Sequence, residues 1–88
     1  MNVLLTLKSI YRELPEAERK VADYILNKSE KAPYESVSRI AQMVGVSVPS
    51  VTRLTRKLGF ASFKDFKVEL AVNTAQLSRV GEIFELNL

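Results

Sequence analysis

Apolar residues recur at three- and four-residue spacing along most of the chain, a spacing that is typical of amphipathic helices. The spacing predicts a first helix from about Val3 to Glu13. Two apolar stripes run along it, Val3/Leu7/Ile10/Leu14 and Leu4/Leu7/Tyr11. Two stripes offer more apolar surface than one small core needs, so we expect this helix to make a second contact, between two copies of the chain.

A second helix is expected after Pro15, because proline disfavours helical geometry at Leu14 and suits the first position of a new helix. Glu16 and Glu18 then fall in the first turn, where the helix dipole favours anions. We expect both carboxylates on solvated faces. The inward side of this helix is predicted to consist of Ala17, Val21, Ala22, Ile25 and Leu26.

The polar segment from Asn27 to Pro33 predicts a loop, with Tyr34 packed beneath it and Ser36 as the N-cap of the next helix. From Val37 to Leu58 the pattern predicts two short helices joined by a tight turn. Their inward positions are Val37, Ile40, Ala41, Val44, Val51, Leu54 and Leu58.

The turn between these two helices has a glycine and a serine where the backbone needs them. Gly45 follows the first helix, where a positive φ is commonly required, and Val46 can then point back into the core. Ser47 can cap the second helix by accepting a hydrogen bond from the amide of Ser50. The segment is therefore predicted to be a helix-turn-helix, with Val48 to Leu58 as the recognition helix. An ordinary corner between two helices, with a solvated basic face, is the alternative.

The outward face of the predicted recognition helix is polar and basic, and we expect no acidic residue to oppose its cations. Arg53 or Arg56 could donate bidentate hydrogen bonds to guanine O6 and N7, and Lys57 is expected to contact a phosphate. At ~1.5 Å per residue the helix is about 16 Å long, which fits a major groove. The residues expected to face outward are Pro49, Ser50, Thr52, Arg53, Arg56 and Lys57.

Gly59 is expected to stop the recognition helix, and Phe60 to fold back onto Leu54. A last long helix is predicted after these two residues. Ser62 and Asp65 form a Ser-x-x-acid capping box at its start. Lys64 and Lys67 flank this start, so its amides could hold a phosphate, although the lysines could equally be incidental to a core helix. The buried face is expected to be Phe63, Phe66, Leu70 and Leu77.

The pattern frays from Ser78 onward, and Gly81 interrupts it before the apolar residues Ile83, Phe84, Leu86 and Leu88. We therefore expect a domain over residues 1–78 and a tail over 79–88. The fold class expected from the whole pattern is all-α, a compact bundle of four to five helices. With 88 residues, 47% apolar content and only three glycines and three prolines, one core can form and a chain rich in disorder or β-turns is not indicated.

Cysteine and histidine are absent, which removes disulfides, thiolate nucleophiles, imidazole bases and zinc sites of the Cys/His kind. The carboxylates are scattered among basic residues, so we expect no enzyme activity, no metal and no cofactor. No stretch approaches the ~18 apolar residues of a membrane span, so we expect no membrane contact and a cytoplasmic location.

The net charge is only +3, but the cations gather in the second half of the chain. A polyanion would approach there, and a solvated basic surface is the alternative. A single anion, Asp65, lies among the six cations Arg39, Arg53, Arg56, Lys57, Lys64 and Lys67.

Sequence-specific binding of double-stranded DNA is the function that these features favour. The expected contact residues are Ser47, Pro49, Ser50, Thr52, Arg53, Arg56, Lys57, Ser62, Lys64 and Lys67. The alternative is a helical protein-interaction or dimerisation module without DNA readout. RNA binding is less favoured, because it uses exposed aromatic rings and Phe60, Phe63 and Phe66 are expected in the core.

Several motifs together resemble the N-terminal domain of RpiR-type bacterial regulators of sugar catabolism. They are Leu14 to Ala22, Gly45-Val46-Ser47, Arg53-Leu54, Arg56-Lys57-Leu58-Gly59-Phe60 and Phe63-Lys64-Asp65-Phe66-Lys67. The resemblance implies a helical domain that binds an operator, an inverted repeat, as a homodimer. It also implies a C-terminal sugar isomerase (SIS) domain that senses phosphosugars. That domain is not among these residues, so a phosphosugar effector would act only through it, and residues 79–88 could be the start of its linker.

Overall fold

The computed structural model describes the backbone of residues 1–86 and the side chains of residues 1–75. Within residues 1–86 it contains no strand, and the prediction of an all-α bundle of four to five helices is confirmed. Its elements, with two short 3₁₀ turns labelled η, are α1 (Val3–Ile10), η1 (Tyr11–Glu13), α2 (Glu16–Asn27), η2 (Ala32–Tyr34), α3 (Val37–Val44), α4 (Val48–Lys57) and α5 (Phe63–Leu86).

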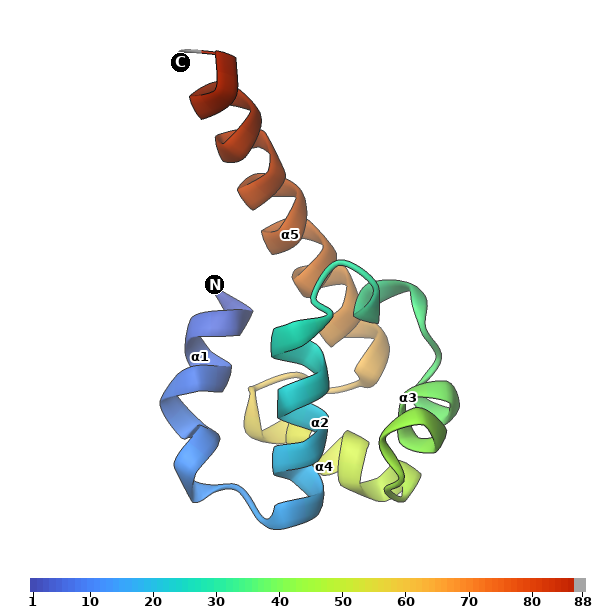
Figure 1. Ribbon diagram of the computed structural model, residues 1–88. Helices are drawn as coiled ribbons and strands as arrows, with labels where there is room; N and C mark the ends of the chain where they lie inside the picture. The colour runs from blue at the N-terminus through green and yellow to red at the C-terminus, as the bar shows by residue number, and fades with distance from the viewer. Residues whose placement is uncertain (87–88) are drawn as a thin grey trace.

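Helix α2 packs against α3 and α4, and α5 packs against α1, α4 and the η2 turn. Figure 1 shows α1 and α3 on opposite sides of α2 and α4 crossing behind α2, with the C-terminal half of α5 standing clear of the other helices. One buried cluster joins these elements. Its members are Val3, Leu7, Leu14, Val21, Ala22, Ile25, Ala32, Ile40, Ala41, Val51, Leu54, Leu58, Phe66 and Leu70.

The first helical segment is broken where the sequence predicted one helix from Val3 to Glu13. The α-helix ends at Ile10, and a 3₁₀ turn follows. Leu14 is extended, with ψ 139°, as the residue before a proline prefers, and Pro15 is the N-cap of α2, one position earlier than predicted. The Tyr11 hydroxyl donates a 2.6 Å hydrogen bond to Asp23 on α2, and this bond raises the pKa of Tyr11 above its ordinary value.

Both apolar stripes of the first segment contact the core, which the sequence did not predict. Val3 and Leu7 are fully buried, while Leu4, Ile10 and Tyr11 are half-buried and pack against the same cluster. The α-helix gives way to a 3₁₀ turn at Tyr11, and residues of both stripes contact the core cluster. The apolar side chain that α1 leaves in solvent is instead Leu5, which is 63% exposed.

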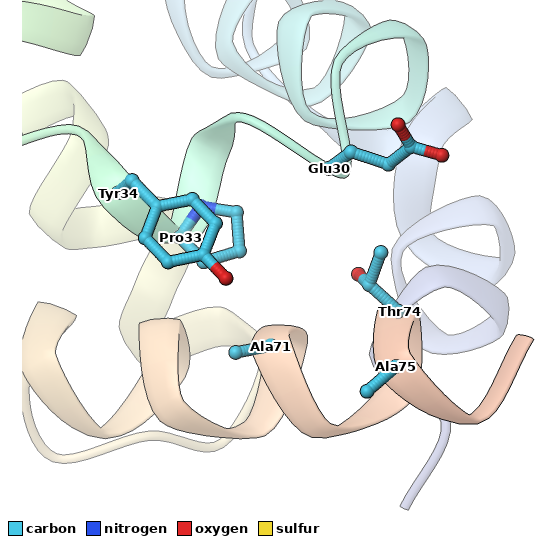
Figure 2. Close-up of a pocket in the computed structure, with 6 residues that line it drawn as sticks. All are labelled: Glu30, Pro33, Tyr34, Ala71, Thr74 and Ala75. Carbon is cyan, nitrogen blue, oxygen red and sulfur yellow. The ribbon is translucent and has the colours of Figure 1, made fainter. Parts of the chain in front are cut away.

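Tyr34 was predicted to pack beneath the α2–α3 loop, and this prediction is wrong, since its side chain is 84% exposed. The η2 turn buries Ala32 and Pro33 there instead. Figure 2 shows Tyr34 at the rim of a hollow of about 240 Å³, with Ala71 and Ala75 of α5 along its other side.

Helix α5 begins as predicted, because the Ser62 hydroxyl accepts a 3.2 Å hydrogen bond from the amide of Asp65. It does not fray at Ser78 or stop at Gly81, but continues to Leu86. A single glycine costs a helix only ~1 kcal/mol relative to alanine, so the helix can pass through it. No helix of the described part is long and apolar enough to cross a membrane. The side chains of Leu77 and of the predicted apolar tail lie outside the described residues.

The buried side chain of Asn73 connects the first helix to the last. It lies on α5, and its Oδ1 accepts a 2.7 Å hydrogen bond from the backbone amide of Val3, the first residue of α1. First-turn amides of a helix have no partner within the helix, so Asn73 satisfies a donor that would otherwise be buried alone.

Candidate nucleic-acid interface

The turn between α3 and α4 has the geometry that its sequence predicts. Ser36 caps α3 by accepting a 3.0 Å hydrogen bond from the amide of Arg39. At the other end Gly45 has φ 79° and ψ 37°, a left-handed conformation that favours glycine. The amides of Gly45 and Val46 both donate to the carbonyl of Ala41, at 2.9 and 3.0 Å. These bonds end α3 and turn the chain sharply into α4.

Helix α4 begins at Val48, and the Ser47 hydroxyl accepts a 3.3 Å hydrogen bond from the amide of Ser50, as predicted. Its last helical residue is Lys57, one position before the predicted end. Gly59 then has φ 98°, and its amide bonds the Arg56 carbonyl while the Phe60 amide bonds the Thr55 carbonyl. This pair of bonds is the Schellman motif. Phe60 packs against the core and meets Phe66 edge-to-face, with ring centroids 5.9 Å apart.

The faces of α4 agree with prediction at most positions. Val51, Leu54 and Leu58 are buried, as expected. On the opposite side Pro49, Arg53, Arg56 and Lys57 are exposed and Thr52 is half-buried.

The prediction that Ser50 faces outward is wrong, because Ser50 is only 4% exposed. Its spacing explains this burial, since Ser50, Leu54 and Leu58 are four residues apart and share one side of the helix. The Ser50 hydroxyl lies 2.9 Å from that of Ser47 and accepts a 3.2 Å hydrogen bond from Nη2 of Arg53. The buried Ser50 hydroxyl therefore contacts both the N-cap residue Ser47 and the side chain of Arg53.

An acidic residue does oppose the cations of α4, contrary to expectation. Glu18 on α2 was predicted to be solvated, yet its side chain is only 4% exposed. Its Oε1 lies 2.7 Å from Nζ of Lys57, and its Oε2 lies 3.9 Å from Nε of Arg53. The sequence does contain the signal for this burial, because Glu18 precedes Val21, Ala22 and Ile25 by three, four and seven residues.

The start of α5 lies directly after this region in the chain. Ser62 and Lys64 are exposed there, and Lys67 is half-buried with its Nζ 5.6 Å from the centre of the Phe63 ring. Phe66 is buried, whereas Phe60 and Phe63 are half-buried against the core. The α4–α5 junction thus presents hydroxyl and ammonium groups and keeps its aromatic rings largely inside.

The sequence and fold are similar to those of known bacterial regulators. HexR of Pseudomonas aeruginosa is 38% identical over 84% of this chain, and HexR of Escherichia coli is 37% identical over 85%. The N-terminal domain of the putative regulator ybbH from Bacillus subtilis is 36% identical over 85% of this chain and 92% of that one, with a TM-score of 0.80. Vibrio vulnificus NanR, complexed with ManNAc-6P, is 29% identical over 93% of this chain and 31% of that one, with a TM-score of 0.82.

The two HexR relatives are named as HTH-type transcriptional regulators, which agrees with the expectation that the chain is not an enzyme. The chain spans about a quarter of the length of the two HexR proteins, 26% in each case. A model of the helix-turn-helix domain of the rpiR family matches residues 1–77. The chain therefore belongs to the rpiR family of helix-turn-helix domains.

Proposed function

We propose that this domain binds double-stranded DNA sequence-specifically, with α4 in the major groove. The observation that carries this proposal is the outward face of α4. Arg53 and Arg56 are exposed on it, and α4 itself contains no acidic residue. Guanidinium groups on an exposed helix of this length suit guanine O6 and N7, which lie together in the major groove.

The surrounding polar groups suit the DNA backbone and neighbouring base edges. Ser47, Pro49 and Thr52 border the arginines on α4 and its cap, and Ser62, Lys64 and Lys67 are assigned to phosphates at the start of α5. Ser50 and Lys57 were also predicted to contact DNA. Because the protein itself engages both side chains, we assign Ser50 to support of Arg53 and Lys57 to its ion pair with Glu18.

The proposed form on DNA is a homodimer on an inverted repeat. One recognition helix reads few base pairs, and a two-fold dimer places two such helices on half-sites about 34 to 36 Å apart. Met1 and Leu5 at α1 and Val68 on α5 are exposed apolar side chains that a second copy could cover.

The proposed regulatory context is sugar or sugar-phosphate metabolism in the cytoplasm. NanR, which shares this fold, was solved with the phosphosugar ManNAc-6P. The HexR relatives and NanR extend far beyond the region that aligns with this chain. A phosphosugar effector would accordingly act through a part of the regulator outside these 88 residues.

Binding selection on randomised duplexes, followed by a salt titration of the recovered site, tests the proposal. A recovered inverted repeat with an affinity that falls steeply with salt is the expected result, because phosphate contacts release counterions. A protein-interaction module would select no DNA, which would overturn the proposal. Preference for single-stranded RNA would overturn it as well, and the inward packing of Phe60, Phe63 and Phe66 argues against such a stacking platform.

A further inference from the structure

The carboxylate of Glu18 is buried at the junction of α2 and α4, and among residues 1–75 both of its charge partners, Lys57 and Arg53, lie on the recognition helix. Nζ of Lys57 lies 2.7 Å from Oε1 of Glu18, but among the described residues no group donates a well-directed hydrogen bond to this oxygen. The second oxygen lies 3.9 Å from Arg53. A buried ion pair often stabilises a fold no more than apolar residues of equal volume would, so stability alone does not account for an acid at this position.

Arg53 is restrained from two sides. Its Nε faces Glu18, and its Nη2 donates to the Ser50 hydroxyl, so these two groups hold one edge of the guanidinium against the protein. The donors of Nη1 and the second donor of Nη2 remain at the outer end of the side chain, which is 59% exposed. An arginine fixed in this way loses less conformational freedom when it binds a base than a free arginine does.

Lys57 is restrained more strongly. Its ammonium group lies at salt-bridge distance from Glu18, while its side chain is still 44% exposed. A lysine released from this contact could reach a DNA phosphate, and a phosphate contact strengthens binding to every sequence alike. The ion pair therefore withholds one cation from sequence-independent binding.

We propose that Glu18 is a specificity-determining positioning residue, which orients Arg53 for base readout and holds Lys57 away from DNA phosphates. The inference rests on the proposed DNA-binding function. Glu18 itself lies beneath the surface and would touch no DNA. Its effect is a larger ratio between affinity for the preferred site and affinity for unrelated DNA.

The test compares Glu18→Gln with Glu16→Gln, using the duplex that the unaltered domain selects and a scrambled duplex of equal length. Both substitutions remove one negative charge from the first turn of α2, but the Glu16 side chain is 85% exposed and pairs with the exposed Lys20. Glu18→Gln should lower the affinity ratio by at least about fivefold, the low end of a bidentate base contact. It should also steepen the salt dependence on both duplexes by about 0.9 for one added phosphate contact.

The double variant Glu18→Gln/Lys57→Met separates the two effects. It should lose the added salt dependence while the affinity ratio remains low. If Glu18→Gln behaves like Glu16→Gln on both duplexes, the inference is overturned, and the proposed function stands. Failure of the unaltered domain to bind any duplex would overturn the proposed function and this inference with it.

Far-ultraviolet circular dichroism shows whether each variant is folded. If Glu18→Gln does not fold, Glu18→Asp replaces it, because aspartate keeps the charge and draws the carboxylate back by one methylene. The expected result is then a smaller loss of the affinity ratio in the same direction. An unchanged ratio in a folded Glu18→Asp domain would overturn the inference.

Discussion

Nζ of Lys57 on the recognition helix lies 2.7 Å from Oε1 of the buried Glu18 on α2. A lysine on the exposed side of a recognition helix would ordinarily be assigned to phosphate. In this domain the ammonium group of Lys57 compensates the negative charge of the buried Glu18 carboxylate. Substitution of Lys57 should therefore alter the stability of the free protein as well as its behaviour on DNA.

Lys57→Met should destabilise the domain by about 1 to 3 kcal/mol, because it leaves the Glu18 carboxylate buried without its nearest cation. Urea unfolding followed by circular dichroism measures this change. The matched control is Lys20→Met, which breaks an exposed pair with Glu16 and should cost about 0.5 kcal/mol or less. Adding Glu18→Gln to Lys57→Met should restore most of the loss. Equal losses for Lys57→Met and Lys20→Met would show that the buried pair contributes nothing.

Arg53→Ala or Arg56→Ala should weaken specific binding by about 1 to 3 kcal/mol and relax the preference at one base pair, if that arginine holds a guanine. Binding selection with each variant measures the preference. Lys31→Ala, at an exposed position in the α2–α3 loop, serves as the control and should leave the selected sequence unchanged. Selection profiles that match the unaltered domain for both arginine variants would disprove the assignment of α4 as the reading helix.

Gly45→Val should destabilise the domain by more than about 1 kcal/mol, because a β-branched residue is strongly disfavoured at φ 79°. The space around the glycine is open, because no described residue beyond its chain neighbours has an atom within 4 Å of an added Cβ, so the cost comes from the backbone and not from a clash. Gly45→Asn is the matched variant and should lose less, since asparagine tolerates this conformation. Identical thermal melts for the two variants would refute this explanation.

Leu5→Glu should weaken binding to a full inverted repeat far more than binding to a half-site, if α1 contributes to a dimer. Leu5 is the suitable position because it is exposed, whereas Leu7 is fully buried and its substitution would unfold the core. Asn27→Glu adds the same charge at an exposed position on α2 and should affect both duplexes alike. Sedimentation that finds one protein per inverted repeat at saturation would contradict the dimer.

The elements of the fold were predictable where the signal is local. Ser36 and Ser47 as caps and Gly45 and Gly59 as stops each act on backbone groups within a few residues, so the sequence beside them determines the outcome. The interruption predicted at Gly81 does not occur, because the small cost of one glycine is outweighed by the helix around it.

The candidate site was less predictable, because part of it depends on which helix faces which. Ser50 and Glu18 both lie on apolar stripes, but their polar side chains suggested exposure. Only the crossing of α2 and α4 brings the cations that make burial of Glu18 tolerable. The prediction for Tyr34 was wrong in the opposite sense, since the turn buries Ala32 and Pro33 and leaves the aromatic ring exposed.

The hydrogen bond between Val3 and Asn73 ties together residues that are 70 positions apart in the sequence. Amides in the first turn of a helix usually exchange with solvent through fraying of that end. The Val3 amide is buried and bonded to α5, so it can exchange only when α1 separates from the rest of the bundle. In deuterium-exchange measurements it should therefore exchange far more slowly than an ordinary first-turn amide, and its rate should report the free energy of separating α1 from the bundle.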